Sequence, residues 1–158
     1  MTGNDLARYQ DPRVIRKILQ TTRTVAIVGL SPNELRASYF VGYYLQRHGF
    51  RIVPVNPREQ EILGETSYPS LDAIPFPIDT VDVFRVPAAV PAIAEAAVRI
   101  SARALWLQFG VINVDGAASA AQSGLHVVMD RCLKVEHARY LGQMQWFGLT
   151  TGVINSQR

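Results

Sequence analysis

The chain has 158 residues, of which 48% are hydrophobic and 18% charged, and its formal net charge is +3. These values are typical of a globular protein, so we expect residues 1–158 to form a single domain. No apolar run approaches the length of a bilayer span, which argues against a membrane protein. The basic residues are spread evenly without a Lys/Arg run, which argues against a nucleic-acid partner.

The N-terminal residues are polar and contain no hydrophobic segment of the kind found in signal peptides. Cys132 is the only cysteine, so the chain cannot form an internal disulfide framework. Both features lead us to expect a cytoplasmic protein.

Helices and strands are predicted to alternate along the whole chain. Asp11 is a good N-cap and Pro12 suits the first helical position, which predicts a helix over 11–20. Apolar runs predict strands at 24–30, 50–56, 81–86, 104–110 and 126–130, and helices are expected at 36–48, 87–101, 114–123 and from 135 through 144. Residues 57–80 are expected to be mostly loop, with a short helical turn at 71–74. Pro54 lies inside the second strand, where one ladder hydrogen bond must be absent.

Five strands that alternate with helices predict an α/β fold with a doubly wound, five-stranded parallel sheet and helices on both faces. The nearly continuous apolarity of the strands agrees with burial on both faces. In such sheets, ligands bind outside the carboxyl ends of the strands, where the strand order reverses. We therefore expect the functional residues at this edge.

Polar and charged residues gather at the predicted strand ends. The set comprises Gly29, Ser31, Asn56, Pro57, Arg58, Arg85, Pro87, Gln108, Gly110, Asp130, Arg131 and Cys132, with Arg36 added by the first loop. Arginine is well suited to bind phosphate oxygens. No nucleophile and base stand at an obvious spacing among these residues.

The loop after the first strand begins like a nucleotide-binding loop, but it lacks the glycines of the dinucleotide fingerprint at the third and sixth positions counted from Gly29. It can still bind phosphate, because it precedes a helix whose first N–H groups are free. Ser31, Ser38 and Arg36 add hydrogen-bond donors. The alternative is a plain connecting loop in which Ser38 or Asn33 acts as the N-cap.

Two further arginines leave alternatives open. Proteins that bind NAD usually carry an acidic residue at the end of the second strand, whereas this chain has Arg58 there. That arginine suits the extra ribose phosphate of NADP or coenzyme A, or it is a solvated loop residue. Arg85 ends an apolar strand, so it must reach solvent, a ligand or an ion-pair partner.

The segment after the fifth strand contains Asp130, Cys132, Glu136 and His137. Catalysis by Cys132 would need a base within hydrogen-bond reach, and we expect His137 to point elsewhere from a helix. A metal site would need more ligands at closer spacing, so none is predicted. His48, at the end of a helix, is expected to interact with the helix dipole.

Five segments, taken together and in order, resemble a known family: "AIVGLSPNELRAS", "VPVNPR", "DVFRVP", "LWLQFGV" and "MDRCLKVEH". They resemble the small stand-alone CoA-binding domain proteins, which are similar to the N-terminal CoA-binding domain of the succinyl-CoA synthetase alpha subunit. The resemblance extends over Thr24–Tyr140. It implies a Rossmann-like fold with coenzyme A, or an acyl-CoA, lying across the carboxyl edge of the sheet.

The resemblance also implies a role for each segment. The loop Ser31–Ser38 would hold the phosphates, Val55–Arg58 would meet the adenosine and its ribose phosphate, Phe84–Pro87 would flank the nucleotide, and Leu107–Gly110 would guide the pantetheine arm. The implied cofactor-binding residues are Gly29, Ser31, Pro32, Arg36, Ser38, Val55, Asn56, Pro57, Arg58, Phe84, Arg85, Pro87, Leu107, Gln108 and Gly110. Glu34 departs from the glycine-rich phosphate loop of the synthetase, and it is unfavourable there unless it points away from the phosphates.

The synthetase alpha subunit carries its phosphorylated histidine on a second domain, and this chain has no counterpart to it. The resemblance therefore implies a non-catalytic module that binds CoA or an acyl-CoA as a carrier, sensor or partner subunit. The alternative is an NADP- or acyl-CoA-dependent enzyme that uses Asp130, Cys132 and Gln108 in the same cleft. A mixed disulfide between Cys132 and the CoA thiol is a further hypothesis. The expected partner is the small-molecule ligand, and a homodimer or an unknown protein partner stays open.

Overall fold

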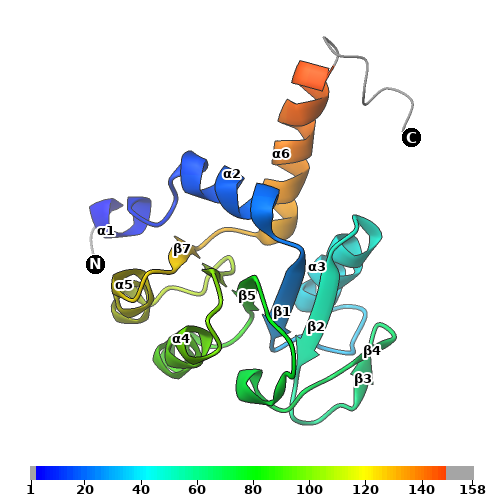
Figure 1. Ribbon diagram of the computed structural model, residues 1–158. Coiled ribbons are helices and arrows are strands. Elements are labelled where there is room, and N and C mark those ends of the chain that lie inside the picture. The colour runs from blue at the N-terminus through cyan, green and yellow to red at the C-terminus, as the bar shows by residue number, and fades with distance from the viewer. Residues whose placement is uncertain (1–2, 149–158) are drawn as a thin grey trace.

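The computed structural model describes residues 3–148, and the side chains of residues 3–144. Its centre is a five-stranded parallel sheet in the order β2-β1-β5-β6-β7 (Figure 1). The strands are β1 (Thr24–Val28), β2 (Arg51–Val55), β5 (Thr80–Val83), β6 (Ala104–Leu107) and β7 (His126–Met129). After β1 the chain forms β2 on one side of that strand, and it then forms β5, β6 and β7 on the other side. This order confirms the predicted doubly wound, Rossmann-like α/β fold.

Helices cover both faces of the sheet (Figure 1). One face packs against α2 (Pro12–Thr21), α3 (Ala37–Arg47) and the start of α6 (Leu133–Gly148), and the other against α4 (Val90–Arg99) and α5 (Val114–Gln122). The short elements are α1 (Gly3–Ala7) and the 3-10 turns η1 (Leu71–Ala73) and η2 (Pro87–Ala89). Within residues 3–148, none of the helices combines the length and apolarity needed to cross a membrane.

Alternate residues of each central strand enter two separate cores. In β1, Val25 and Ile27 face the layer of α2, α3 and α6, while Ala26 and Val28 face α4 and α5. This division follows from the pleat, which points successive side chains to opposite faces. Because both faces are covered, the strands are apolar throughout, as the sequence predicted.

The predicted elements are confirmed, with shifted ends. The helix predicted over 11–20 is α2, which has Asp11 as its N-cap, and the Asp11 carboxylate accepts a hydrogen bond of 2.8 Å from the amide of Arg13. The strands end earlier than predicted, since β1 stops at Val28 and β6 at Leu107. Apolar residues continue past these points because the following loops are also partly buried.

The expectation that residues 57–80 are mostly loop missed a small antiparallel hairpin. Its strands are β3 (Glu61–Ile62) and β4 (Glu65–Thr66). The two residues between them, Leu63 and Gly64, both have positive φ values, of 55° and 77°. That conformation is typical of the tight turns that close two-residue hairpins.

Both outer strands of the sheet are partly covered along their free edges. The backbone amide of Asn56 donates to the carbonyl of Tyr68 (2.9 Å), and the amide of Tyr68 donates to the carbonyl of Pro54 (3.0 Å). Pro54 therefore lies in an edge strand, where the ladder bond that it lacks would have faced outward. On the opposite edge, the amide of Met129 donates to the carbonyl of Tyr9 (3.0 Å).

Candidate functional site

The strand order reverses between β1 and β5, and an open groove of about 660 Å³ lies at the carboxyl ends of these strands. Gly29 follows β1 directly, with a φ of 89°. A Cβ atom on Gly29 would lie 2.2 Å from the carbonyl oxygen of Phe84, the residue that follows β5. Only glycine permits this close approach of the two strand ends.

The loop between β1 and α3 is folded by its own polar side chains. The Ser38 hydroxyl accepts from the amide of Ser31 (3.0 Å), and the Ser31 hydroxyl accepts from the amide of Asn33 (3.0 Å). The Asn33 side chain accepts from the amide of Leu35 (2.9 Å). These three bonds fix the path of the loop between β1 and α3.

Helix α3 begins without a side-chain cap. Its N-cap is Arg36, whose side chain makes no capping bond, so neither Ser38 nor Asn33 has the N-cap role of the plain-loop alternative. The amides of Ala37 and Ser38 in the first turn have no acceptor among the described residues, and both residues line the groove. Free amides at a helix N-terminus favour an anion.

Three arginines reach the same groove from three loops: Arg36, Arg58 and Arg85. None of their guanidinium groups forms an ion pair with a residue that the structure describes. The structural ion pair that was the alternative for Arg85 is thus absent from the described part of the chain. Unpaired positive charge beside free helix amides makes this groove suited to phosphate groups.

Asn56 holds the end of β2 against the first loop. Its side-chain amide donates to the carbonyl of Leu30 (3.0 Å), and its side-chain oxygen accepts from the amide of Arg58 (2.9 Å). Asn56 itself does not line the groove, but it fixes the backbone from which Arg58 projects. It is therefore a positioning residue.

A second hollow, mostly apolar and about 360 Å³ in volume, lies on the other side of Arg85. Its walls come from the ends of β1 and β2, from η1 and from α4. They include Val28, Val55, Pro57, Leu71, Ala89, Ala92 and Ile93, and Arg85 lines both this hollow and the groove. An apolar hollow beside a groove that is suited to phosphate groups has the character of a site for a planar base.

The structure brings seven of the fifteen predicted site residues into the groove: Gly29, Ser31, Arg36, Ser38, Arg58, Phe84 and Arg85. Val55 and Pro57 line the apolar hollow instead. The other six line neither: Pro32, Asn56, Pro87, Leu107, Gln108 and Gly110. Glu34 is exposed and does not line the groove, so it is no obstacle to an anion there.

The residues after β6 differ most from the sequence expectation. Leu107 is fully buried, and the side-chain oxygen of Gln108 accepts from the amide of Leu133 (3.0 Å) at the start of α6. Gln108 therefore has a structural contact. Val111 lines the groove and lies outside the predicted site segments, whereas Ala37, which also lines it, falls within the predicted loop Ser31–Ser38. Phe109 falls within the predicted segment Leu107–Gly110 and is 76% exposed. Val111 is an apolar residue that follows Gly110, and the sequence carried no signal for its place in the groove.

The residues of the enzyme alternative are engaged in structural contacts. The Asp130 carboxylate accepts from the amide of Gly110 (2.7 Å), and Cys132 packs partly buried against the core. His137 is buried, and its Nδ1 lies 2.9 Å from the Tyr44 hydroxyl. Burial and the nearby His48 lower the pKa of His137 to about 4. His48 is the C-cap of α3, and its ring bonds the carbonyl of Tyr44 (2.8 Å), as expected for a residue at a helix end.

Comparison with known proteins gives a consistent result. The family model described as "CoA binding domain" matches residues 23–138. The uncharacterized protein YneT of Bacillus subtilis is 40% identical over 124 residues, which cover 78% of this chain and 92% of that protein. A hypothetical protein from Pyrococcus horikoshii has 37% identity and a TM-score of 0.81, with 84% and 93% of the two chains covered.

A similar fold is found in part of a larger protein. The dinucleotide-forming acetyl-coenzyme A synthetase 1 of Candidatus Korarchaeum cryptofilum matches with a TM-score of 0.61 and 18% identity. The match covers 68% of this chain but only 26% of the synthetase. At this level of identity, the likeness concerns the fold alone.

Proposed function

The chain belongs to the CoA-binding domain family, and from this premise we propose that it binds coenzyme A or an acyl-CoA in the groove at the switch point, as a non-catalytic module. The observation that carries the proposal is that two amides at the start of α3 and three arginine side chains, none of them with a partner among the described residues, line the same groove. Coenzyme A carries a diphosphate and a ribose 3′-phosphate, so it presents several negative groups to such a surface.

The shape of the site suggests an orientation for the ligand. The adenine would occupy the apolar hollow beside Val55 and Pro57, and the diphosphate would lie at the start of α3. Arg85 lines both sites, so it would contact the region where the ribose joins the diphosphate. The pantetheine arm would then extend over Val111 and the exposed Phe109.

The non-catalytic role rests on the contacts of the candidate catalytic groups. Gln108 bonds the start of α6, Asp130 bonds the loop after β6, and the His137 ring faces Tyr44. Gln108 and Asp130 accept from backbone amides, and the His137–Tyr44 pair lies away from the groove, since neither residue lines it. A carrier, sensor or subunit role needs only the binding site.

The Arg58→Ala variant tests the proposed ligand. Arg58 would pair with the ribose 3′-phosphate, which CoA has and dephospho-CoA lacks. A charge-assisted phosphate contact contributes roughly 1.5–3 kcal/mol, so the variant should bind CoA about 10- to 150-fold more weakly. Binding of dephospho-CoA should change far less. Calorimetric titration at fixed salt measures both affinities.

The matched control is Arg103→Ala. Arg103 is exposed and directly precedes β6, so it lies at the amino-terminal ends of the strands and away from the groove. It removes the same charge and should leave both affinities unchanged. An equal loss for CoA and dephospho-CoA in Arg58→Ala would remove Arg58 from this role. Absence of CoA binding by the unaltered protein, with NADP bound instead, would refute the proposed function itself.

A further inference from the structure

A separate pocket lies between α2 and α6, and no residue that lines it lines the groove. Its volume is about 240 Å³. The lining residues are Gln10, Pro12, Ile15, Arg16, Leu19, Arg131, Glu136, Arg139, Tyr140 and Gln143. The pocket lies by the outer strand β7, on the face of the sheet that α2 and α6 cover.

The positive charge of this pocket is only partly balanced. Arg16 forms no side-chain hydrogen bond or ion pair with a described residue, whereas Arg139 pairs with the buried carboxylate of Glu136 at 2.8 Å. Among the residues that the structure describes, Glu136 is the only acidic one that lines the pocket. The three arginines Arg16, Arg131 and Arg139 against one carboxylate leave two positive charges.

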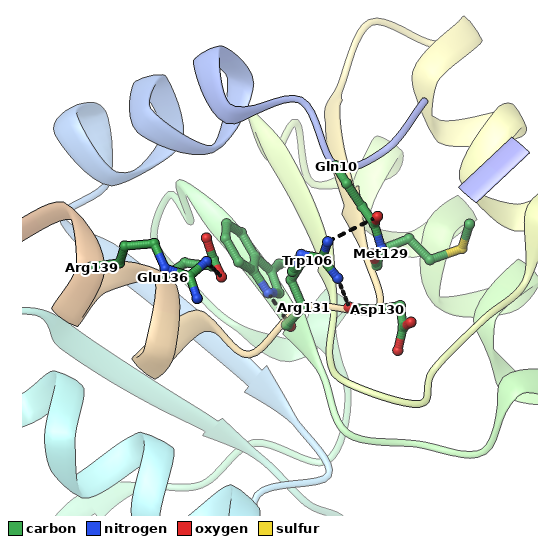
Figure 2. A network of polar contacts seen from close by, with 7 residues as sticks. All are labelled: Gln10, Trp106, Met129, Asp130, Arg131, Glu136 and Arg139. Carbon is green, nitrogen blue, oxygen red and sulfur yellow. Dashed lines mark hydrogen bonds and ion pairs between the residues drawn. The ribbon is translucent and has the colours of Figure 1, made fainter. Parts of the chain in front are cut away.

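Arg131 is held in place by neutral acceptors only (Figure 2). Its guanidinium donates to the side-chain oxygen of Gln10 (3.0 Å) and to the carbonyl of Asp130 (3.0 Å). Gln10 is itself fixed, because its amide donates to the carbonyl of Met129 (3.1 Å). A guanidinium has five N–H donors, so Arg131 keeps donors for a ligand.

The backbone around Arg131 directs its side chain into this pocket. Asp130 adopts a φ of 60°, in the left-handed region that few non-glycine residues occupy. The Asp130 carboxylate turns to the amide of Gly110, away from Arg131, so it does not neutralise the guanidinium. The indole of Trp106 donates to the carbonyl of Arg131 (2.8 Å) and fixes the peptide on the other side.

We propose that this pocket is a second ligand site, which binds a small organic oxyanion, a carboxylate or a phosphate that carries an apolar group. The anionic group would lie among Arg16, Arg131 and Arg139, because arginine forks match planar and tetrahedral oxyanions. The apolar group would lie against Ile15, Leu19 and Tyr140. This site stands independently of CoA binding in the groove.

The test is an NMR titration of the full-length ¹⁵N-labelled protein without CoA. The indole N–H of Trp106, bonded to Arg131, reports on the pocket. Sodium hexanoate and phenyl phosphate are the two probes, each added at constant ionic strength against sodium chloride. A saturable shift of the Trp106 signal is expected, and the probe that binds more tightly identifies the oxyanion as carboxylate or phosphate.

Three variants localise the effect. Arg131→Gln should weaken the tighter probe at least about tenfold, the size of a charge-assisted contact. Arg16→Gln should also weaken it. Arg16 is exposed and its side chain has no partner between residues 3 and 144, so the substitution should not harm the fold. Its matched control is Lys17→Gln, a neighbour on α2 that does not line the pocket. Shifts that never saturate for either probe, or an equal loss in Lys17→Gln and Arg16→Gln, would overturn the proposal.

Discussion

Replacing Gly29 by Ala is expected to destabilise the protein by about 2–5 kcal/mol, the sum of a left-handed backbone and an overpacked contact. The added Cβ would lie 2.2 Å from the Phe84 carbonyl oxygen, which belongs to the backbone and cannot rotate away. To relieve the clash, the ends of β1 and β5 must separate. Because these ends form the floor of the groove, the affinity for CoA should decrease together with the free energy of unfolding. Urea unfolding and calorimetric titration measure the two effects.

Gly49→Ala is the matched control. Gly49 has the same φ of 89°, but nothing lies within 4 Å of the position that a Cβ would take. The control therefore carries the backbone cost alone, about 1–2 kcal/mol, and should leave CoA binding unchanged. If Gly29→Ala lost no more stability than Gly49→Ala, the close approach of the two strand ends would have no energetic importance.

The free energy of unfolding of Asp82→Asn, compared with that of the unaltered protein at the same pH, is expected to increase as the pH rises above 4. Asp82 lies in β5 beside Ile27 and Trp106, is fully buried, and has no hydrogen-bond partner for either oxygen among the described residues. Burial raises the pKa of Asp82 well above its usual value. The folded protein therefore keeps this carboxyl protonated at pH values where the unfolded chain releases the proton.

The sign follows from proton linkage. In the unfolded chain, the Asp82 carboxyl has its ordinary pKa of about 3.9. Above this pH the unfolded chain binds fewer protons than the folded protein. The contribution of Asp82 therefore lowers the free energy of unfolding by about 1.4 kcal/mol per pH unit, until the pH reaches the pKa of Asp82 in the folded protein. The asparagine side chain of the variant does not titrate, so the stability difference between variant and unaltered protein should grow at that slope. A difference that stays constant from pH 4 to 7 would contradict the prediction.

The unaltered protein alone would not reveal this effect, because His137 acts in the opposite direction. Its pKa is lowered from about 6.5 to about 4, so its contribution to stability is complete above pH 6.5 and is lost as the pH falls toward 4. Between pH 4 and 6.5, the two residues partly cancel. Both Asp82→Asn and the unaltered protein contain His137, so the difference between their unfolding free energies isolates Asp82.

The sequence was sufficient to predict the architecture because burial leaves a periodic signal. Five apolar strands separated by helices, and the N-cap at Asp11, are each visible without coordinates and are confirmed. The ends of the strands were less accessible. Leu30 is fully buried although it lies beyond Gly29, where the chain has already left the ladder. Apolarity reports burial and not hydrogen bonding, so the strand appeared longer than it is.

The candidate site was predictable where it depends on topology and unpredictable where it depends on side-chain direction. Arg36, Arg58 and Arg85 meet in the groove because parallel strands place their carboxyl ends on one edge. Gln108 also follows a strand, yet its side chain turns inward to the start of α6. That contact joins residues 25 positions apart, and no local pattern encodes it.

The hairpin of β3 and β4 was missed for a related reason. Each strand has two residues, which is too short for an alternating pattern. Leu63, in its turn, has a positive φ that leucine rarely adopts, while its carbonyl accepts from the Gln46 side chain (3.0 Å) on α3. At Leu63 a tertiary contact, and not local preference, holds the turn, whereas glycine suits the positive φ at Gly64.

Backbone hydrogen bonds from Tyr68 to β2 and from Tyr9 to β7 cover part of the two outer strands of the sheet, which limits how molecules of this protein can associate. The free edge of a β-sheet can recruit another strand through its backbone groups, and edge pairing of this kind leads to aggregation. Here the chain occupies part of each margin itself, with Tyr68 along β2 and Tyr9 at the end of β7, and Pro54 offers no amide on the β2 side. A strand of a second copy could therefore not pair along the whole length of either outer strand without displacing a segment of this chain.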